Sequence, residues 1–233
     1  MPERTPPTAP WPGLVVAVLA AAAMVIASVL AWPDMAESIV TREARGEHGA
    51  SVVSRGVTAV ALPIAFLLVA AVLTAAPALD RWLRARVRLP AQVNARGGVR
   101  VLNYALTGLA IFFLVFHLGL LSLHTGGGFP LETAVPAAGG LLIVLLGIAL
   151  PLARPEDTFG SAALERVRRV IGPAYRIAGF TLVALGLFTI AAAFLWPPAA
   201  AAAGASSVAI AVLAGGAGAA VRARRQGSGQ PSA

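Results

Sequence analysis

The chain has no cysteine and no lysine among its 233 residues, and only 12% of them are charged. The missing cysteines exclude disulfide bonds, thiolate catalysis, cysteine zinc sites and palmitoylation. The scarcity of charge excludes a soluble globular domain, because such a domain carries about 25% charged residues. Aromatic residues are also few, at 6%, whereas hydrophobic residues in total make up 58%. We therefore interpret the chain as an integral membrane protein.

Six apolar stretches are long enough to cross a bilayer, for which a helix needs roughly 20 residues. They are residues 13–32, 56–79, 101–123, 134–153, 177–196 and 199–221. The first is longer than the apolar part of a secretory signal and its leader carries little positive charge, so we expect it to be retained. Backbone polar groups must be paired within lipid, which favours helices. The predicted fold class is all-α: one polytopic membrane helix bundle with six transmembrane helices.

The basic residues, all of them arginine, are distributed unevenly between the two sides of the predicted bundle. Of 18 arginines, fifteen lie near the N-terminus, in the connectors 80–100 and 154–176 or in the C-terminal tail. Cytoplasmic loops carry an excess of positive charge. We therefore predict a plasma-membrane (inner-membrane) protein with both termini in the cytoplasm and the lipid bilayer as its first partner. The net charge of +8 has a topological explanation, so direct nucleic-acid binding is not expected.

The third span carries the most informative polar residues. Asn103, Thr107, His117 and His124 recur at helical spacing on one stripe. Polar atoms exposed to acyl chains are costly, so we expect this stripe to face the bundle interior. The opposite stripe should then face lipid; it consists of Leu102, Leu106, Leu109, Phe112, Phe116, Leu120 and Leu123.

Two interpretations of His117 remain open. It could titrate or bind a ligand, because histidine changes charge near neutral pH. Alternatively, its ring is a structural group that is hydrogen-bonded to a neighbouring helix.

Two further patterns concern packing and the cytoplasmic side. Glycines at heptad spacing, Gly140 with Gly147 and Gly179 with Gly186, predict close helix contacts. The connector 154–176 contains an apolar stripe beside several arginines, which favours a short separate amphipathic helix at the inner leaflet.

The sequence predicts no catalytic residue, no cofactor and no metal site. Glu47, His48, His124 and Glu132 share the outer side, but they lack the close, fixed spacing of zinc ligands. No glycine-rich phosphate loop, nucleophile elbow or HExxH helix is present. No acid, base and activated nucleophile can be assembled from these residues, so an enzyme is not expected.

Six predicted spans have both termini on one side, Trp32, Pro33 and Asp34 lead into an outer loop that contains Gly46, and the segment AYRIAGFTLVALGL opens the fifth span. This layout resembles the SdpI-like family of bacterial immunity membrane proteins. The family pattern is also matched at Gly160, Arg176 and Gly179, while Tyr175 stands where the family has a histidine. The resemblance implies a protein that protects against a secreted killing peptide and sequesters a transcriptional regulator at the membrane.

Two functional hypotheses follow. The first is a non-enzymatic, immunity-type or signalling-type protein that binds an envelope-active peptide outside or a regulator in the cytoplasm. It has two candidate surfaces, the first outer loop, residues 33–55, and the basic connector, residues 154–176. The outer loop holds the three remaining arginines, Arg42, Arg45 and Arg55, together with His48. The alternative is a small transporter or permease subunit with a polar path along the third span. The sequence does not predict the oligomeric state.

Overall fold

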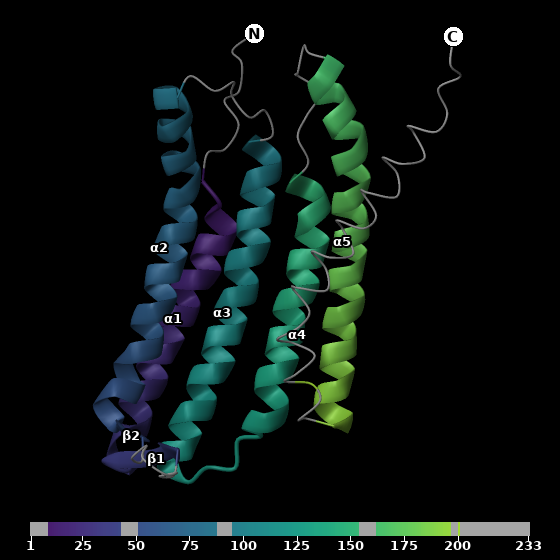
Figure 1. Ribbon diagram of the computed structural model, residues 1–233. Coiled ribbons are helices and arrows are strands. Elements are labelled where there is room, and N and C mark those ends of the chain that lie inside the picture. The colour runs from purple at the N-terminus through teal and green to yellow at the C-terminus, as the bar shows by residue number, and fades with distance from the viewer. Residues whose placement is uncertain (1–8, 43–50, 88–94, 154–161, 197–199, 201–233) are drawn as a thin grey trace, which may run out of the picture.

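The computed structural model describes residues 9–42, 51–87, 95–153, 162–196 and 200. Within these described ranges, five long helices run alternately up and down along one direction (Figure 1). These are α1 (Trp11–Ala31), α2 (Arg55–Val87), α3 (Ala95–Thr125), α4 (Leu131–Ala149) and α5 (Ala162–Leu195). Short 3-10 turns, η1 (Trp32–Asp34) and η2 (Leu150–Ala153), extend the ends of α1 and α4.

Each of the five helices contains a segment long and apolar enough to cross a membrane. The prediction of apolar, membrane-length helices is confirmed for the first five spans. The sixth predicted span, 199–221, lies outside the described residues except for Ala200. The five segments are Trp11–Asp34, Arg55–Leu79, Gly97–Thr125, Leu131–Leu152 and Pro173–Leu195.

A two-stranded hairpin caps the end of the bundle at which α1 ends and α2 begins (Figure 1). Strand β1 (Ser38–Arg42) pairs antiparallel with β2 (Ser51–Ser54), and Ser38 lies opposite Ser54. The sequence analysis predicted no strand here. The reason for the strands is local, because β-branched residues such as Val52 and Val53 favour extended backbone over helix.

Helix α3 lies between two groups of helices, with α1 and α2 on one side and α4 on the other (Figure 1). The prediction that its second stripe faces lipid was therefore wrong for much of that stripe. Leu106 is fully buried and lies against Gly13 of α1, and Phe112 is half-buried beside Gly139 of α4. Leu123, near the end of the helix, is 51% exposed as expected. A central helix has protein neighbours on both faces, which a pattern within one helix cannot show.

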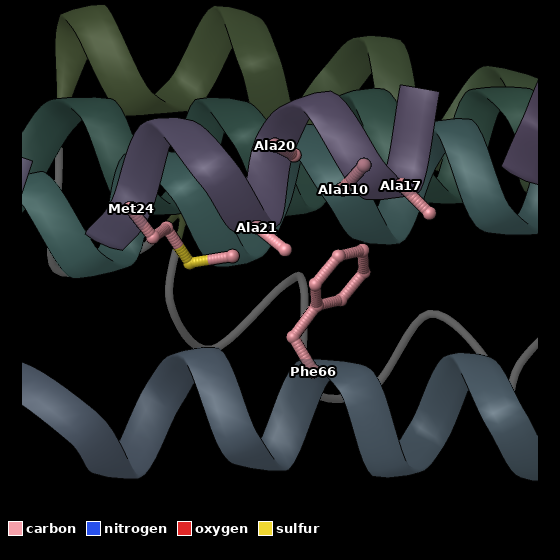
Figure 2. Close-up of a cluster of buried hydrophobic side chains, with 6 residues drawn as sticks. All are labelled: Ala17, Ala20, Ala21, Met24, Phe66 and Ala110. Atoms are coloured by element: carbon pink, nitrogen blue, oxygen red, sulfur yellow. The ribbon is translucent and has the colours of Figure 1, made fainter. Parts of the chain in front are cut away.

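Small side chains bring α1 close to α2 and α3. Phe66 reaches from α2 toward Ala17, Ala20 and Ala21 of α1, as Figure 2 shows. Phe66 is fully buried, and its ring lies 5.4 Å from that of Phe113 on α3, centroid to centroid. One large ring thus fills the space that three alanines leave open.

Helices α4 and α5 contact each other through glycine backbone. A Cβ atom added to Gly147 would lie 2.7 Å from the carbonyl oxygen of Gly179, and one added to Gly186 would lie 2.6 Å from the carbonyl oxygen of Gly140. No side chain fits at these distances. The predicted close packing at the heptad-spaced glycines is confirmed.

Helix α5 differs from the prediction at its beginning. It starts at Ala162 and continues through Pro173 to Leu195 without interruption. The connector therefore does not form a separate amphipathic helix over the residues described. Proline is tolerated in a long helix where neighbouring groups can pair the freed carbonyl, so Pro173 does not mark a boundary.

Candidate functional site

The polar stripe of α3 was predicted to face the bundle interior, and its side chains make hydrogen bonds there with α1, with α2 and with the segment after α1. At its beginning, the backbone N–H of Gly13 donates to Oδ1 of Asn103 over 2.8 Å. A Cβ on Gly13 would lie 2.9 Å from the Cα of Asn103, so the glycine permits this approach. The amide side chain thereby satisfies a donor of the first turn of α1, where no intrahelical acceptor exists.

His117 joins three helices deep in the bundle. Its ring is fully buried, and Nε2 lies 2.9 Å from Oγ of Ser28 and 3.1 Å from the carbonyl oxygen of Met24, both on α1. The hydroxyl of Ser28 donates in turn to the carbonyl oxygen of Ala59 on α2, over 3.2 Å. The chain of bonds links α3 to α1 and α1 to α2.

The partners of His117 assign its tautomer. A carbonyl oxygen only accepts, so Nε2 carries the hydrogen that points to Met24 and Ser28. Nδ1 then holds an unshared lone pair, and this buried atom has no hydrogen-bond partner in the described part of the chain. The geometry corresponds to a structural joint, the second of the two interpretations.

His124, two turns further along α3, fastens the segment after α1. Its Nδ1 lies 3.1 Å from the carbonyl oxygen of Ala36, and the N–H of Ala36 donates to the carbonyl oxygen of His124 over 2.9 Å. On the other side of the ring, Nε2 lies 2.7 Å from Oγ1 of Thr58 on α2. Nδ1 is therefore the protonated nitrogen and Nε2 accepts from the threonine hydroxyl, the opposite tautomer to that of His117.

Arg55 adds a second attachment at this end. Its guanidinium carbon lies 4.8 Å from the centroid of the Trp32 ring. The backbone N–H of Arg55 donates to the carbonyl oxygen of Glu37 over 3.0 Å. Pro33 and Asp34, between these residues in sequence, are exposed. These two contacts of Arg55 hold the start of α2 against the end of α1 and the segment after it, and so fix the base of the hairpin.

The remaining predicted site residues do not all come together. Arg42 ends β1 opposite Ser51, at the other end of the hairpin from the Ser38–Ser54 pair that precedes Arg55. Arg45, Gly46, His48 and Gly160 lie outside the described residues. Half-buried Tyr175 and exposed Arg176 belong to α5. They precede Gly179, which packs against Pro151 at the far end of α4, so they belong to the opposite end of the bundle.

Two important residues were missed by the sequence analysis, Ser28 and Thr58. Both are buried and both are hydrogen-bonded to a histidine. A signal was present, because Ser28 is the single polar residue of α1 and a lone hydroxyl in an apolar span requires a partner. Its pairing with His117 needed the three-dimensional register of two helices.

The buried polar side chains of α3 act as hydrogen-bonding groups toward α1 and α2. Among the described residues, no three histidine, aspartate or glutamate side chains gather as a metal site. Met24, Phe66 and Ala110 form an apolar cluster between Asn103 and His117, so the stripe is not polar along its whole length.

Comparison with known proteins gives no family assignment: no family model, no curated protein and no solved structure matches the chain.

Proposed function

We propose that the chain is a bacterial inner-membrane protein that acts by binding, with the hairpin end as its extracytoplasmic recognition surface. The partner is a secreted, envelope-active peptide, as the resemblance to SdpI-like immunity proteins implies. Both termini lie in the cytoplasm, and the sixth span 199–221 completes the bundle. No catalytic step is part of this function.

The observation that carries the proposal is the anchoring of the hairpin. A connector that only joined two helices would need no fixed geometry, yet this one is fastened by His124 and Arg55. Side chains nearby remain free to meet a partner, since Asp34 and Glu37 are exposed and Val52 is 57% exposed. A rigid base that presents exposed polar and apolar groups is typical of a binding surface.

The orientation can be tested with single cysteines, because the chain has none of its own. Gly128→Cys lies at the hairpin end and Gly98→Cys at the opposite end, and at both positions a Cβ meets nothing within 4 Å. A membrane-impermeant maleimide should label Gly128→Cys in intact spheroplasts and Gly98→Cys only after permeabilisation. The reverse pattern would reject the orientation.

The function can be tested by challenging a deletion strain with a panel of secreted envelope-active peptides. Greater sensitivity to at least one peptide is expected, with rescue by the wild-type chain and weaker rescue by the double variant Asp34→Ala/Glu37→Ala. Glu132→Ala is the matched control, because this exposed acid lies at the same end but on α4. Unchanged sensitivity of the deletion strain to the whole panel would contradict the proposal.

A further inference from the structure

The lipid-facing side of α2 continues beyond the apolar span. The span ends at Leu79, whereas the helix continues for eight residues to Val87, about 12 Å at 1.5 Å per residue. Exposed side chains recur along this side at intervals of three, four and seven residues, which is one helix face. They are Leu68, Val72, Leu79, Trp82 and Arg86, and the first four are 62%, 68%, 56% and 52% exposed.

The last two residues of this face form a pair. The guanidinium carbon of Arg86 lies 4.6 Å from the centroid of the Trp82 ring. Helical side chains point back toward the N-terminus, so the guanidinium lies near the height of Trp82, about one turn beyond Leu79. The polar layer on each side of a bilayer is about 5–8 Å thick. The charge of Arg86 therefore falls at the depth of the lipid phosphates.

The chemistry of the pair fits an anionic phosphodiester. Stacking on an indole uses the face of the guanidinium and leaves its N–H groups in the plane, where they can form two parallel bonds to a phosphate. The sequence at this end of the helix is also basic, because residues 80–87 contain Arg81, Arg84 and Arg86 against one acid, Asp80. Arg100, on the first turns of α3, is exposed as well.

We propose that Trp82 and Arg86 form a binding site for the headgroup of an anionic phospholipid. The indole lies against the glycerol region and the acyl chains run along Leu79 and Val72. The site belongs to the basic end of the bundle, opposite the hairpin, and does not depend on the peptide partner proposed above. In the proposed orientation it meets the cytoplasmic leaflet, which carries anionic lipid.

The Arg55–Trp32 pair at the hairpin end supplies an internal contrast. Its ring-to-guanidinium distance is similar, at 4.8 Å, but Arg55 is half-buried and joins two separate elements. Arg86 and Trp82 belong to one helix and face outward, so their contact fastens nothing else. The first pair connects parts of the protein, and the second is free to bind lipid.

The test is a titration of the purified full-length protein with phosphatidylglycerol in detergent, with bound lipid counted by native mass spectrometry. Arg86→Ala should weaken the tightest phosphatidylglycerol site about fivefold or more, since one cation near an anionic surface contributes about 1 kcal/mol. Arg86→Lys, which keeps the charge but loses the planar fork, should fall between wild type and Arg86→Ala. Arg55→Ala should bind phosphatidylglycerol like the wild type.

Further titrations distinguish a lipid headgroup from a soluble phosphate ester as the ligand. Phosphatidylcholine should bind the wild type more weakly, and Arg86→Ala should not change that binding. Soluble glycerol 3-phosphate should fail to displace the lipid. Any one of three results would overturn the proposal: the wild type and Arg86→Ala bind phosphatidylglycerol equally, Arg55→Ala loses as much affinity for phosphatidylglycerol as Arg86→Ala does, or glycerol 3-phosphate displaces the lipid. A melting temperature within about 2 °C of that of the wild type checks that Arg86→Ala is folded. If Arg86→Ala melts lower than this, the titration is done with Arg86→Gln instead.

Discussion

The helices on the two sides of α3 are held together by different means. Toward α1 and α2, His117, His124 and Asn103 make hydrogen bonds of 2.7–3.1 Å through side chains. Between α4 and α5, the closest contacts involve glycines and the backbone of the facing helix. Lipid tails are as apolar as leucine, so helices in a membrane associate through packing and polar bonds and not through apolar burial. The protein uses polar bonds on one side of α3 and close packing beyond it.

The comparison predicts different tolerance to substitution. A glycine contact fails as soon as one methyl group is added, because backbone atoms of the neighbouring helix can give way only if the two helices move apart. A hydrogen-bonded joint fails in parts, because His117, His124 and Ser28 each have more than one partner. The glycine contact should therefore be the more sensitive of the two.

The largest effect is expected from the double variant Gly147→Ala/Gly186→Ala. The new methyl groups would lie 2.7 and 2.6 Å from carbonyl oxygens, so α4 and α5 must separate. Overpacking of this kind costs about 2 kcal/mol per site, or about 4 kcal/mol in all. The free energy of unfolding in detergent measures the loss.

Gly139→Ala is the matched control on α4. Its Cβ would lie 3.7 Å from the ring of Phe112, an ordinary contact, and alanine favours a helix over glycine by up to about 1 kcal/mol. This variant should be neutral or slightly stabilising. Equal loss in the control and the double variant would show that the close contact does not limit stability.

A smaller effect is expected at the polar joint. His117→Ala removes the bonds to Met24 and Ser28 and leaves a space where a buried ring stood, so a loss of about 2 kcal/mol is expected. Ser28→Ala should cost less, because it adds no comparable space. A double-mutant cycle in detergent should give a coupling of about 0.6 kcal/mol, typical of hydrogen bonds between membrane helices. A coupling of zero would mean that the Ser28–His117 bond contributes nothing.

Much of this architecture is predictable from sequence, and the reason differs between the two regions. The glycine pairs can be recognised in the sequence by their heptad spacing, because glycines at this spacing in an apolar helix allow a neighbouring helix to approach closely. The spans can be recognised in the sequence because the thickness of the bilayer sets the length of apolar sequence that each helix needs. Both features are properties of a single segment.

The polar joint could be predicted only in part. The stripe from Asn103 to His124 indicated which side of α3 is buried, but not which helix supplies the partners. Ser28 and Thr58 are single hydroxyls whose partners depend on the register between helices. Leu106 was predicted to face lipid but is buried, because α3 is a central helix with protein neighbours on both faces.

At the hairpin end, His124→Ala tests whether the polar joint also fixes the loop. The substitution removes the ring bonds to Ala36 and Thr58, so the segment after α1 should open more often. Amide hydrogen exchange of Ala36, whose N–H is bonded to the carbonyl oxygen of His124, should become about tenfold faster, which corresponds to about 1.4 kcal/mol of local opening. Thr58→Val, which keeps the bond to Ala36, should accelerate exchange less. Unchanged exchange in His124→Ala would show that the backbone pairing at Ala36 suffices.

The smallest effect is expected at the Arg55–Trp32 pair, in which a guanidinium lies over an indole ring at the hairpin end. A cation over an indole at a partly exposed site contributes about 0.5–1 kcal/mol, so Arg55→Ala should lower the free energy of unfolding by that amount. Trp32→Phe should lose about half as much, because the phenyl ring attracts a cation less strongly. The effect should persist in 1 M salt, since the contact is short and half-buried. Loss of the difference in salt would identify long-range charge, and not stacking, as the force that holds Arg55 to Trp32.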